Sequence, residues 1–177
     1  MVRAVRISNR CRAAALALVP VLVCFATAAR AAGACDGSIQ ASALRPLPDP
    51  LTVAIQATRS APEEEKVRQR FVDAMQASGV TVEPTGSVVM RLSFLVTAME
   101  EGGRPRQFSD FSWASATGTA APIITATITL SDPQRGTLIW VATLQCRMKQ
   151  RDPEALAAQL GQVIGQTLGT HVSERTF

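Results

Sequence analysis

The stretch from Ile123 to Met148, IITATITLSDPQRGTLIWVATLQCRM, decides the fold. Apolar residues occupy every second position on both sides of a short polar connector, and a period of two residues is typical of a strand with one buried face. The connector, 131–136, contains Pro133 and Gly136, which favour a turn. We therefore predict an antiparallel hairpin at the centre of a sheet. The side chains expected on its apolar face are Ile124, Ala126, Ile128 and Leu130 before the turn, and Leu138, Trp140, Ala142, Leu144, Cys146 and Met148 after it.

The rest of the chain supplies elements that can cover this hairpin. Alternation predicts further strands from Leu51 to Thr58 and from Val88 to Ala98, and the segment 79–86 has room for a very short one. A helix is expected from Pro62 to about Ser78, with Ser60 as N-cap in a capping box with Glu63. Adjacent residues of a helix point in different directions, so Glu63, Glu64 and Glu65 mark a helix start better than a metal site.

A second helix is expected from Pro153 to about Ser173, with Asp152 as its N-cap. Together these elements predict an α+β fold with one antiparallel or mixed sheet of about four strands and two helices packed on one face. The sequence predicts a single α+β domain over 51–175, preceded by an extended tether over 32–50 in which three prolines lie near the end.

The first 31 residues have the pattern of a signal peptide. Four arginines precede an apolar run from Ala13 to Ala29, and the small residues at Ala29 and Ala31 flank Arg30 as a signal peptidase requires. Cleavage between Ala31 and Ala32 is therefore expected. The alternative is an uncleaved membrane helix, but the apolar run is shorter than the roughly 20 residues that span a bilayer.

Removal of residues 1–31 changes the charge of the chain. This segment holds five arginines and no acidic residue, so 13 of the 18 basic residues remain beside 14 acidic ones, a net charge of −1. Nucleic-acid binding, which depends on excess positive charge, is not expected of the mature chain.

Two of the four cysteines, Cys35 and Cys146, remain after cleavage. An even pair in an exported protein predicts a disulfide, which would tie the N-terminal tail to the hairpin. The alternative is that Ala32-Gly33-Ala34-Cys35 is a lipobox and Cys35 is acylated, although the usual leucine three residues before the cysteine is missing.

The segment 100–121 breaks every periodic pattern and is long for a loop in a small domain. It combines aromatic and arginine side chains, which are favoured as anchors at binding surfaces. Two interpretations remain open: the rings fold back over the sheet as a lid, or they form a partner-binding edge. The residues concerned are Arg104, Arg106, Phe108, Phe111 and Trp113.

Glycines recur at four-residue spacing in the last predicted helix, at Gly161, Gly165 and Gly169. A glycine inside a helix costs about 1 kcal/mol relative to alanine, so the repeat needs a structural reason. Close packing of this helix on the sheet is one explanation. A contact with a partner helix or a second copy of the chain is the other.

The mature chain carries few residues suited to catalysis. His171 is its only histidine, no cysteine or histidine has metal-ligand spacing, and neither a nucleophile-elbow nor a phosphate-binding motif occurs. We therefore expect no enzyme activity, no cofactor and no metal site. A hydrolase that uses His171 as its base is the remaining catalytic hypothesis.

The hairpin run from Thr129 to Trp140 resembles an L-x-D-P-x-x-G-x-L-x-W motif of small exported bacterial domains, many of them lipoproteins. The architecture is similar to that of lipopolysaccharide-assembly lipoproteins and of lipoprotein activators of peptidoglycan synthases. The resemblance implies an accessory role in the cell envelope, either at an envelope protein or at a lipid.

These observations predict a periplasmic, non-catalytic protein that binds or assembles envelope components through the loop 100–121. The alternative is an outer-membrane-associated lipoprotein that holds lipid in an apolar groove between the sheet and the glycine-striped helix. Peripheral membrane association and homo-oligomers fit either hypothesis.

Overall fold

The computed structural model describes residues 33–56, 61–97, 104–116, 122–149 and 151–177. All of them lie in the unit of the chain that spans Ala31–Phe177. The predicted signal peptide, 1–31, its cleavage point between Ala31 and Ala32, and the predicted N-cap Ser60 lie outside the described residues.

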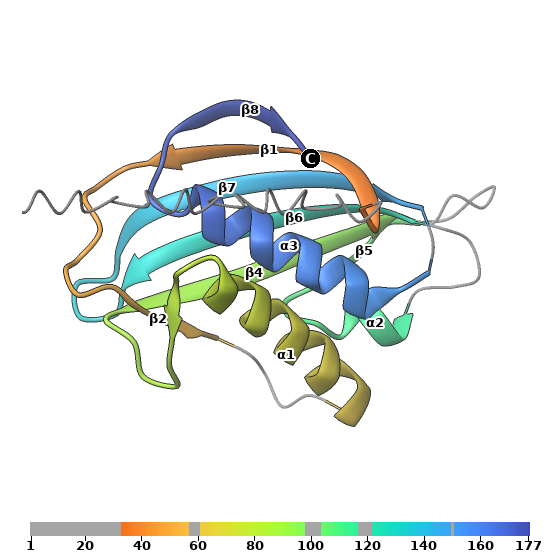
Figure 1. The fold of residues 1–177 in the computed structure, drawn as a ribbon, viewed down its shortest axis with the longest axis horizontal. Coiled ribbons are helices and arrows are strands. Elements are labelled where there is room, and N and C mark those ends of the chain that lie inside the picture. Colours follow the sequence, from red (N-terminus) through yellow and green to blue (C-terminus); the bar gives the residue numbers. More distant parts are fainter. Residues whose placement is uncertain (1–32, 57–60, 98–103, 117–121, 150) are drawn as a thin grey trace, which may run out of the picture. The chain divides into compact units, whose positions relative to one another are not determined.

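One mixed sheet contains all eight strands of the described residues, in the order β3-β2-β4-β6-β7-β1-β8, with β5 paired to β4 beside this path (Figure 1). The α+β class fits, but the prediction of about four strands and two helices is wrong, because the described residues form eight strands and three helices. The strands are β1 (Cys35–Ala43), β2 (Thr52–Ile55), β3 (Thr81–Val82), β4 (Val88–Thr97), β5 (Arg106–Phe108), β6 (Ile123–Asp132), β7 (Thr137–Met148) and β8 (Val172–Thr176).

The predicted hairpin is the pair β6 and β7. Ala126 lies opposite Leu144 and Ile128 opposite Ala142, so the expected apolar residues meet on one face. The register shifts near Trp140, where Leu130 pairs with Trp140 but Ser131 pairs with Leu138. This irregularity turns Leu138 to the other face, where it is 39% exposed, and the prediction that Leu138 points inward is wrong.

The segment predicted as a tether contributes a strand instead. β1 pairs antiparallel with β7 over its whole length, from Cys35 opposite Met148 to Ala43 opposite Trp140. Cys35, Ile39 and Ala41 are buried in the core. Gly37 lies so close to β7 that a Cβ atom there would meet the carbonyl oxygen of Gln145, which explains why a residue with low strand propensity occupies this position.

The last helix ends earlier than predicted. α3 (Pro153–Thr167) is followed by a turn at Gly169, whose φ of 73° is readily adopted only by glycine. The chain then reverses and adds β8 to the free edge of β1. His171 therefore lies exposed just before a strand and not in a helical turn, which corrects its predicted place.

The helices α1 (Pro62–Ala77) and α3 lie side by side over one face of the sheet (Figure 1). α1 begins at Pro62 as predicted, but its N-cap is Ala61, one residue after the predicted Ser60, and the Glu64 carboxylate accepts a hydrogen bond from the Ala61 N–H at 2.9 Å. The third helix, α2 (Trp113–Ala116), is a single short turn. The core lies between this layer and the inward residues of β1, β4, β6 and β7.

Candidate functional site

The aromatic segment predicted as a binding edge is folded into the core. Phe111 and Trp113 are buried, and Phe94 of β4 contacts both, with ring centroids 5.9 Å and 5.6 Å away. Phe111 also packs on Phe71 of α1 at 5.3 Å. These two rings fold back against β4 and α1 and are not exposed to a partner, which fits the lid interpretation better than the binding edge for Phe111 and Trp113.

Other parts of this segment stay at the surface. Arg104 and Arg106 are exposed, and Phe108 is half-buried at the end of β5. Asp110 is buried and accepts a hydrogen bond from the Ser112 N–H at 2.9 Å, which stabilises the turn between β5 and α2. Positions 100–103 and 117–121 of the predicted loop lie outside the described residues.

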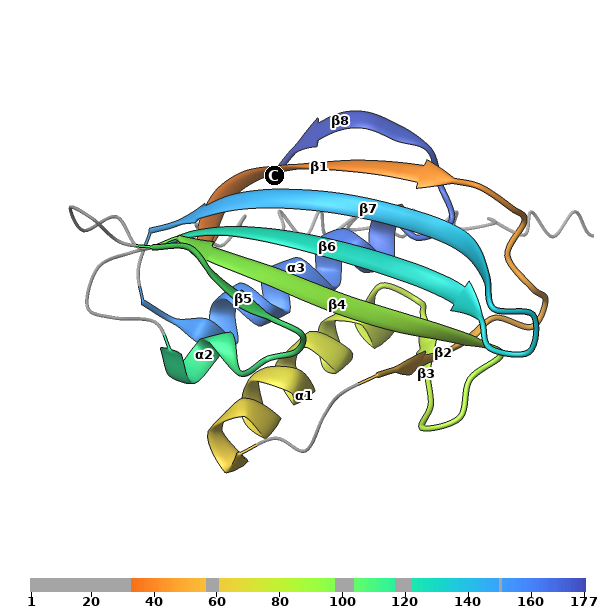
Figure 2. The same ribbon diagram turned by 180° about the vertical axis from the view of Figure 1, so that it is seen from behind.

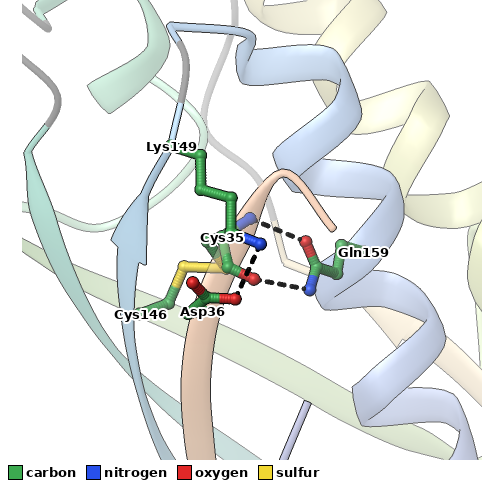
Figure 3. The surroundings of a disulfide bond; sticks show 5 residues. All are labelled: Cys35, Asp36, Cys146, Lys149 and Gln159. Atoms are coloured by element: carbon green, nitrogen blue, oxygen red, sulfur yellow. Dashed lines mark hydrogen bonds and ion pairs between the residues drawn. A yellow bond between two sulfur atoms is a disulfide. The ribbon is translucent and has the colours of Figure 1, made fainter. Parts of the chain in front are cut away.

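The predicted disulfide between Cys35 and Cys146 is confirmed (Figure 3). Both cysteines are buried, and the bond joins positions 111 residues apart. A sulfur held in a disulfide carries no acyl chain, so this structure fits the disulfide alternative and not the lipidation of Cys35.

Gln159 of α3 forms hydrogen bonds with the beginning of β1 beside this disulfide (Figure 3). Its side-chain oxygen accepts a hydrogen bond from the N–H of Cys35, and its side-chain nitrogen donates one to the C=O of Cys35, each at 2.9 Å. An ion pair at 2.8 Å between Lys149 and Asp36 adds a further link between β1 and the end of β7. This role could not be predicted from the sequence, because a glutamine on a helix gives no signal of a partner 124 residues away.

The helical glycines pack on the neighbouring helix of the same chain. A Cβ atom at Gly161 would lie 2.3 Å from the backbone oxygen of Phe71, and one at Gly165 would lie 2.7 Å from the Cβ of Ser78. Both contacts are with α1 and its C-terminal turn. This finding differs from both predicted explanations, the sheet and a partner molecule, and Gly169 serves the turn after the helix.

The face of the sheet opposite the helices is not covered by any element of the described residues (Figure 2). The outward positions of its strands are rich in hydroxyl and amide groups. Pairing across β4, β6, β7 and β1 arranges its outward side chains in rows. The row at one end, Thr97-Ile123-Arg147-Asp36, carries two charged residues, and three further rows begin at Leu95, Ser93 and Arg91 of β4. Leu95 and Val141 are the apolar members of these three rows, and Arg91 is the charged one. The three rows are Leu95-Thr125-Gln145-Ser38, Ser93-Thr127-Thr143-Gln40 and Arg91-Thr129-Val141-Ser42. We call this surface the polar face.

A notch lies beside β4 on the polar face, where the ends of two strands converge. β2 runs parallel to β4 and reaches Met90, whereas β5 runs antiparallel to β4 and reaches Phe94. Their carboxyl ends therefore point toward each other across positions 91–93 of β4. Among the described residues, no strand pairs with these three positions on that side.

The notch has a volume of about 330 Å³, at the low end of the roughly 300–1,000 Å³ typical of ligand sites. Its charged member is Arg91, whose Nε donates to the Gln56 side-chain oxygen at 2.6 Å. Hydroxyl groups from three strand segments surround this guanidinium: Ser93 of β4, Ser109 after β5, and Thr127 and Thr129 of β6.

This arrangement can bind polar groups by hydrogen bonding. A guanidinium is a donor of hydrogen bonds, whereas a hydroxyl both donates and accepts. The alternation in β6 predicts that its threonines lie on the face opposite the core. The notch itself depends on where β2 and β5 end along β4, which a periodic pattern does not reveal.

Two other features are absent from the part of the chain that the structure describes. No group of three or more histidine, cysteine or acidic side chains is placed to hold a metal ion. No helix among these residues is both long enough and apolar enough to cross a membrane.

No protein-family model matches this chain, and no curated protein sequence matches it. Among solved structures, the PelC dodecamer from Paraburkholderia phytofirmans is 15% identical, with a TM-score of 0.45, over 77% of this chain and 99% of that chain. A point variant of PelC gives 16% identity, the same TM-score, and 76% and 98% coverage. A PDZ domain protein from Parabacteroides distasonis is 9% identical, with a TM-score of 0.47, over 81% of this chain and 39% of that chain. At such values the similarity carries no inference about the function of this chain.

Proposed function

We infer that this protein is an exported, non-catalytic binding domain of the cell envelope, held together by its disulfide and binding through the polar face. The observation that carries the inference is the Cys35–Cys146 bond, which connects the first strand of the fold to a central one. Structural disulfides persist in oxidising compartments such as the periplasm. The basic and apolar pattern of residues 1–31 supplies the matching export signal.

The polar face supports binding as the activity. The notch presents hydroxyl, amide and guanidinium groups, which hold a ligand by hydrogen bonds. The aromatic segment does not serve this purpose, since Phe111 and Trp113 fill the core. The lipid-carrier hypothesis required a groove beside the glycine stripe, and Gly161 and Gly165 are in contact with α1.

Fractionation of the native cells tests the proposed compartment. We expect osmotic shock to release the protein with the periplasmic contents, in a form without residues 1–31. The matched control is the chain that begins at Ala32 behind a start methionine, which should remain in the cytoplasm. Retention of the full-length chain in the cytoplasm, or in membranes after washing with high salt, would contradict the proposal.

A further inference from the structure

The notch offers a positive charge that no acidic side chain of the described residues pairs with. Among the described residues, none of the ion pairs includes Arg91. Its hydrogen bond to Gln56 uses one of the five N–H donors of the guanidinium and leaves the charge in place. The lining residues that the structure describes include no carboxylate. The notch is therefore complementary to an anionic group.

The other lining groups select for a ligand rich in hydroxyls. Ser93, Thr127 and Thr129 follow each other closely on two paired strands, with Ser93 opposite Thr127 and Arg91 opposite Thr129. Ser109 faces them from the end of β5. Four hydroxyls around one guanidinium match a ligand in which several hydroxyls accompany one negative charge.

The polar face continues beyond the notch in the same chemistry. The row that begins with Ser93 and Thr127 passes through Thr143 of β7 to Gln40 of β1. A second hollow of about 350 Å³ lies on this side, with Gln40, Ser42 and Thr143 in its lining. A ligand longer than one unit can therefore keep its hydrogen bonds as it crosses the sheet.

We propose that the notch binds a uronic acid unit of an acidic polysaccharide. The carboxylate contacts the Arg91 guanidinium, and the ring hydroxyls bond to Ser93, Ser109, Thr127 and Thr129. Neighbouring units of the chain lie across the polar face. This proposal rests on the proposed function, since it names the ligand class of the same binding surface.

Titration of the purified mature protein with tri-galacturonate, followed by the amide signals in NMR spectra, tests the proposal. The trimer should shift signals of β4, β5 and β6 around the notch. Its methyl ester, which keeps the shape but removes the charge, should bind at least about tenfold more weakly, because a hydrogen bond to a charged group contributes about 1.5–3 kcal/mol. The ester needs no change in the protein, so the result does not depend on a variant that folds.

Two matched variants test whether Arg91 supplies the positive charge that binds the ligand. Arg91→Gln should weaken binding of tri-galacturonate at least about tenfold. Arg70→Gln makes the same charge change at an exposed position of α1, on the side of the sheet away from the polar face, and should leave the affinity unchanged. Equal binding of acid and ester, equal binding by Arg91→Gln and the unaltered protein, or no binding of tri-galacturonate would overturn the proposal. Any of these results leaves the proposed compartment to be decided by fractionation.

Discussion

Single residues explain how distant parts of this chain are joined. Gln159 satisfies both backbone groups of Cys35, although the two residues are 124 positions apart. A backbone group that loses its partner away from water costs about 1–3 kcal/mol. The glutamine amide is suited to this position because its NH2 group donates and its oxygen accepts in the same plane.

We predict that Gln159→Ala lowers the free energy of unfolding by about 1–3 kcal/mol, because the N–H and the C=O of Cys35 both lose a hydrogen bond. Urea unfolding followed by circular dichroism measures the change. Gln162→Ala, an exposed position on the same helix, is the control and should change stability by less than about 0.5 kcal/mol. Equal stability of the two variants would show that the hydrogen bonds between Gln159 and Cys35 do not stabilise the fold.

Gly161 is the residue that lets α3 approach α1. An alanine there would gain about 1 kcal/mol of helix propensity. Its methyl group would lie 2.3 Å from the backbone oxygen of Phe71, which can move only if α1 moves with it. We predict that Gly161→Ala destabilises the protein by a net of roughly 1–3 kcal/mol in urea unfolding.

Gly165→Ala provides the comparison for this contact. The nearest atom at that position is the Cβ of Ser78 at 2.7 Å, which is a smaller overlap than the 2.3 Å at Gly161 and lies at the C-terminal end of α1. We expect the smaller loss for Gly165→Ala. If both variants were as stable as the unaltered chain, close packing of the two helices would not be the reason for these glycines.

At the scale of whole elements, the surface of α1 carries an ion pair whose effect on titration is measurable. Arg68 donates a hydrogen bond from Nε to Glu65 at 2.8 Å and pairs with it one turn along the helix. This hydrogen bond lowers the pKa of the Glu65 carboxyl, with a smaller opposing effect from desolvation. Both groups are partly exposed, so the pair contributes little to stability.

We predict that Arg68→Gln raises the pKa of Glu65 toward its ordinary value, as measured by NMR titration of the side-chain carboxyl. The pKa of Glu65 is lower in the folded than in the unfolded chain. The stabilisation is therefore present above the unfolded pKa and is lost as the pH falls through the folded pKa. Arg70→Gln, which removes a pair with Glu154 instead, should leave Glu65 unchanged. If the pKa of Glu65 does not change in Arg68→Gln, the hydrogen bond from Arg68 is not the cause of its low value.

Elements with a strong period could be predicted from the sequence, and those fixed by distant contacts could not. The alternation of apolar residues from Ile124 to Leu130 predicts β6. The start of α1 is predicted to within one residue by Pro62 and the glutamates that follow it. β1 contains Gly37 and several small residues, and its place depends on β7 and the disulfide. Val172 of β8 falls at the position where the next apolar residue of α3 would be expected, so the sequence pattern predicts a longer helix. The chain reverses direction at Gly169, whose φ is positive.

The same limit applies to the candidate site. The outward direction of Thr125, Thr127 and Thr129 could be predicted from the period of two. The notch could not, since it depends on the pairing of β2 with one half of β4 and of β5 with the other. Phe111 and Trp113 have the composition of a binding surface, and their burial depends on the space that α1 leaves beside β4.

At the scale of the whole molecule, the disulfide joins the beginning of the described fold to its centre. It closes a loop of 111 residues. In the chain-entropy model, a loop of this length corresponds to about 4–5 kcal/mol of stabilisation. We predict that Cys35→Ala with Cys146→Ala lowers the free energy of unfolding by about this amount in urea.

Reductant supplies the control for this prediction. Dithiothreitol should lower the unfolding midpoint of the unaltered protein and leave that of the double variant unchanged, because the variant has no disulfide to reduce. A double variant as stable as the oxidised protein would show that the hydrogen bonds between β1 and β7 are sufficient without the bond.

The most direct test of an exported, disulfide-stabilised domain is the intact mass of the protein purified from its native envelope, measured with and without reductant. We expect a chain that begins at Ala32 and gains the mass of two hydrogens on reduction. A chain that begins at an acylated Cys35, or a mass that does not change on reduction, would contradict this expectation.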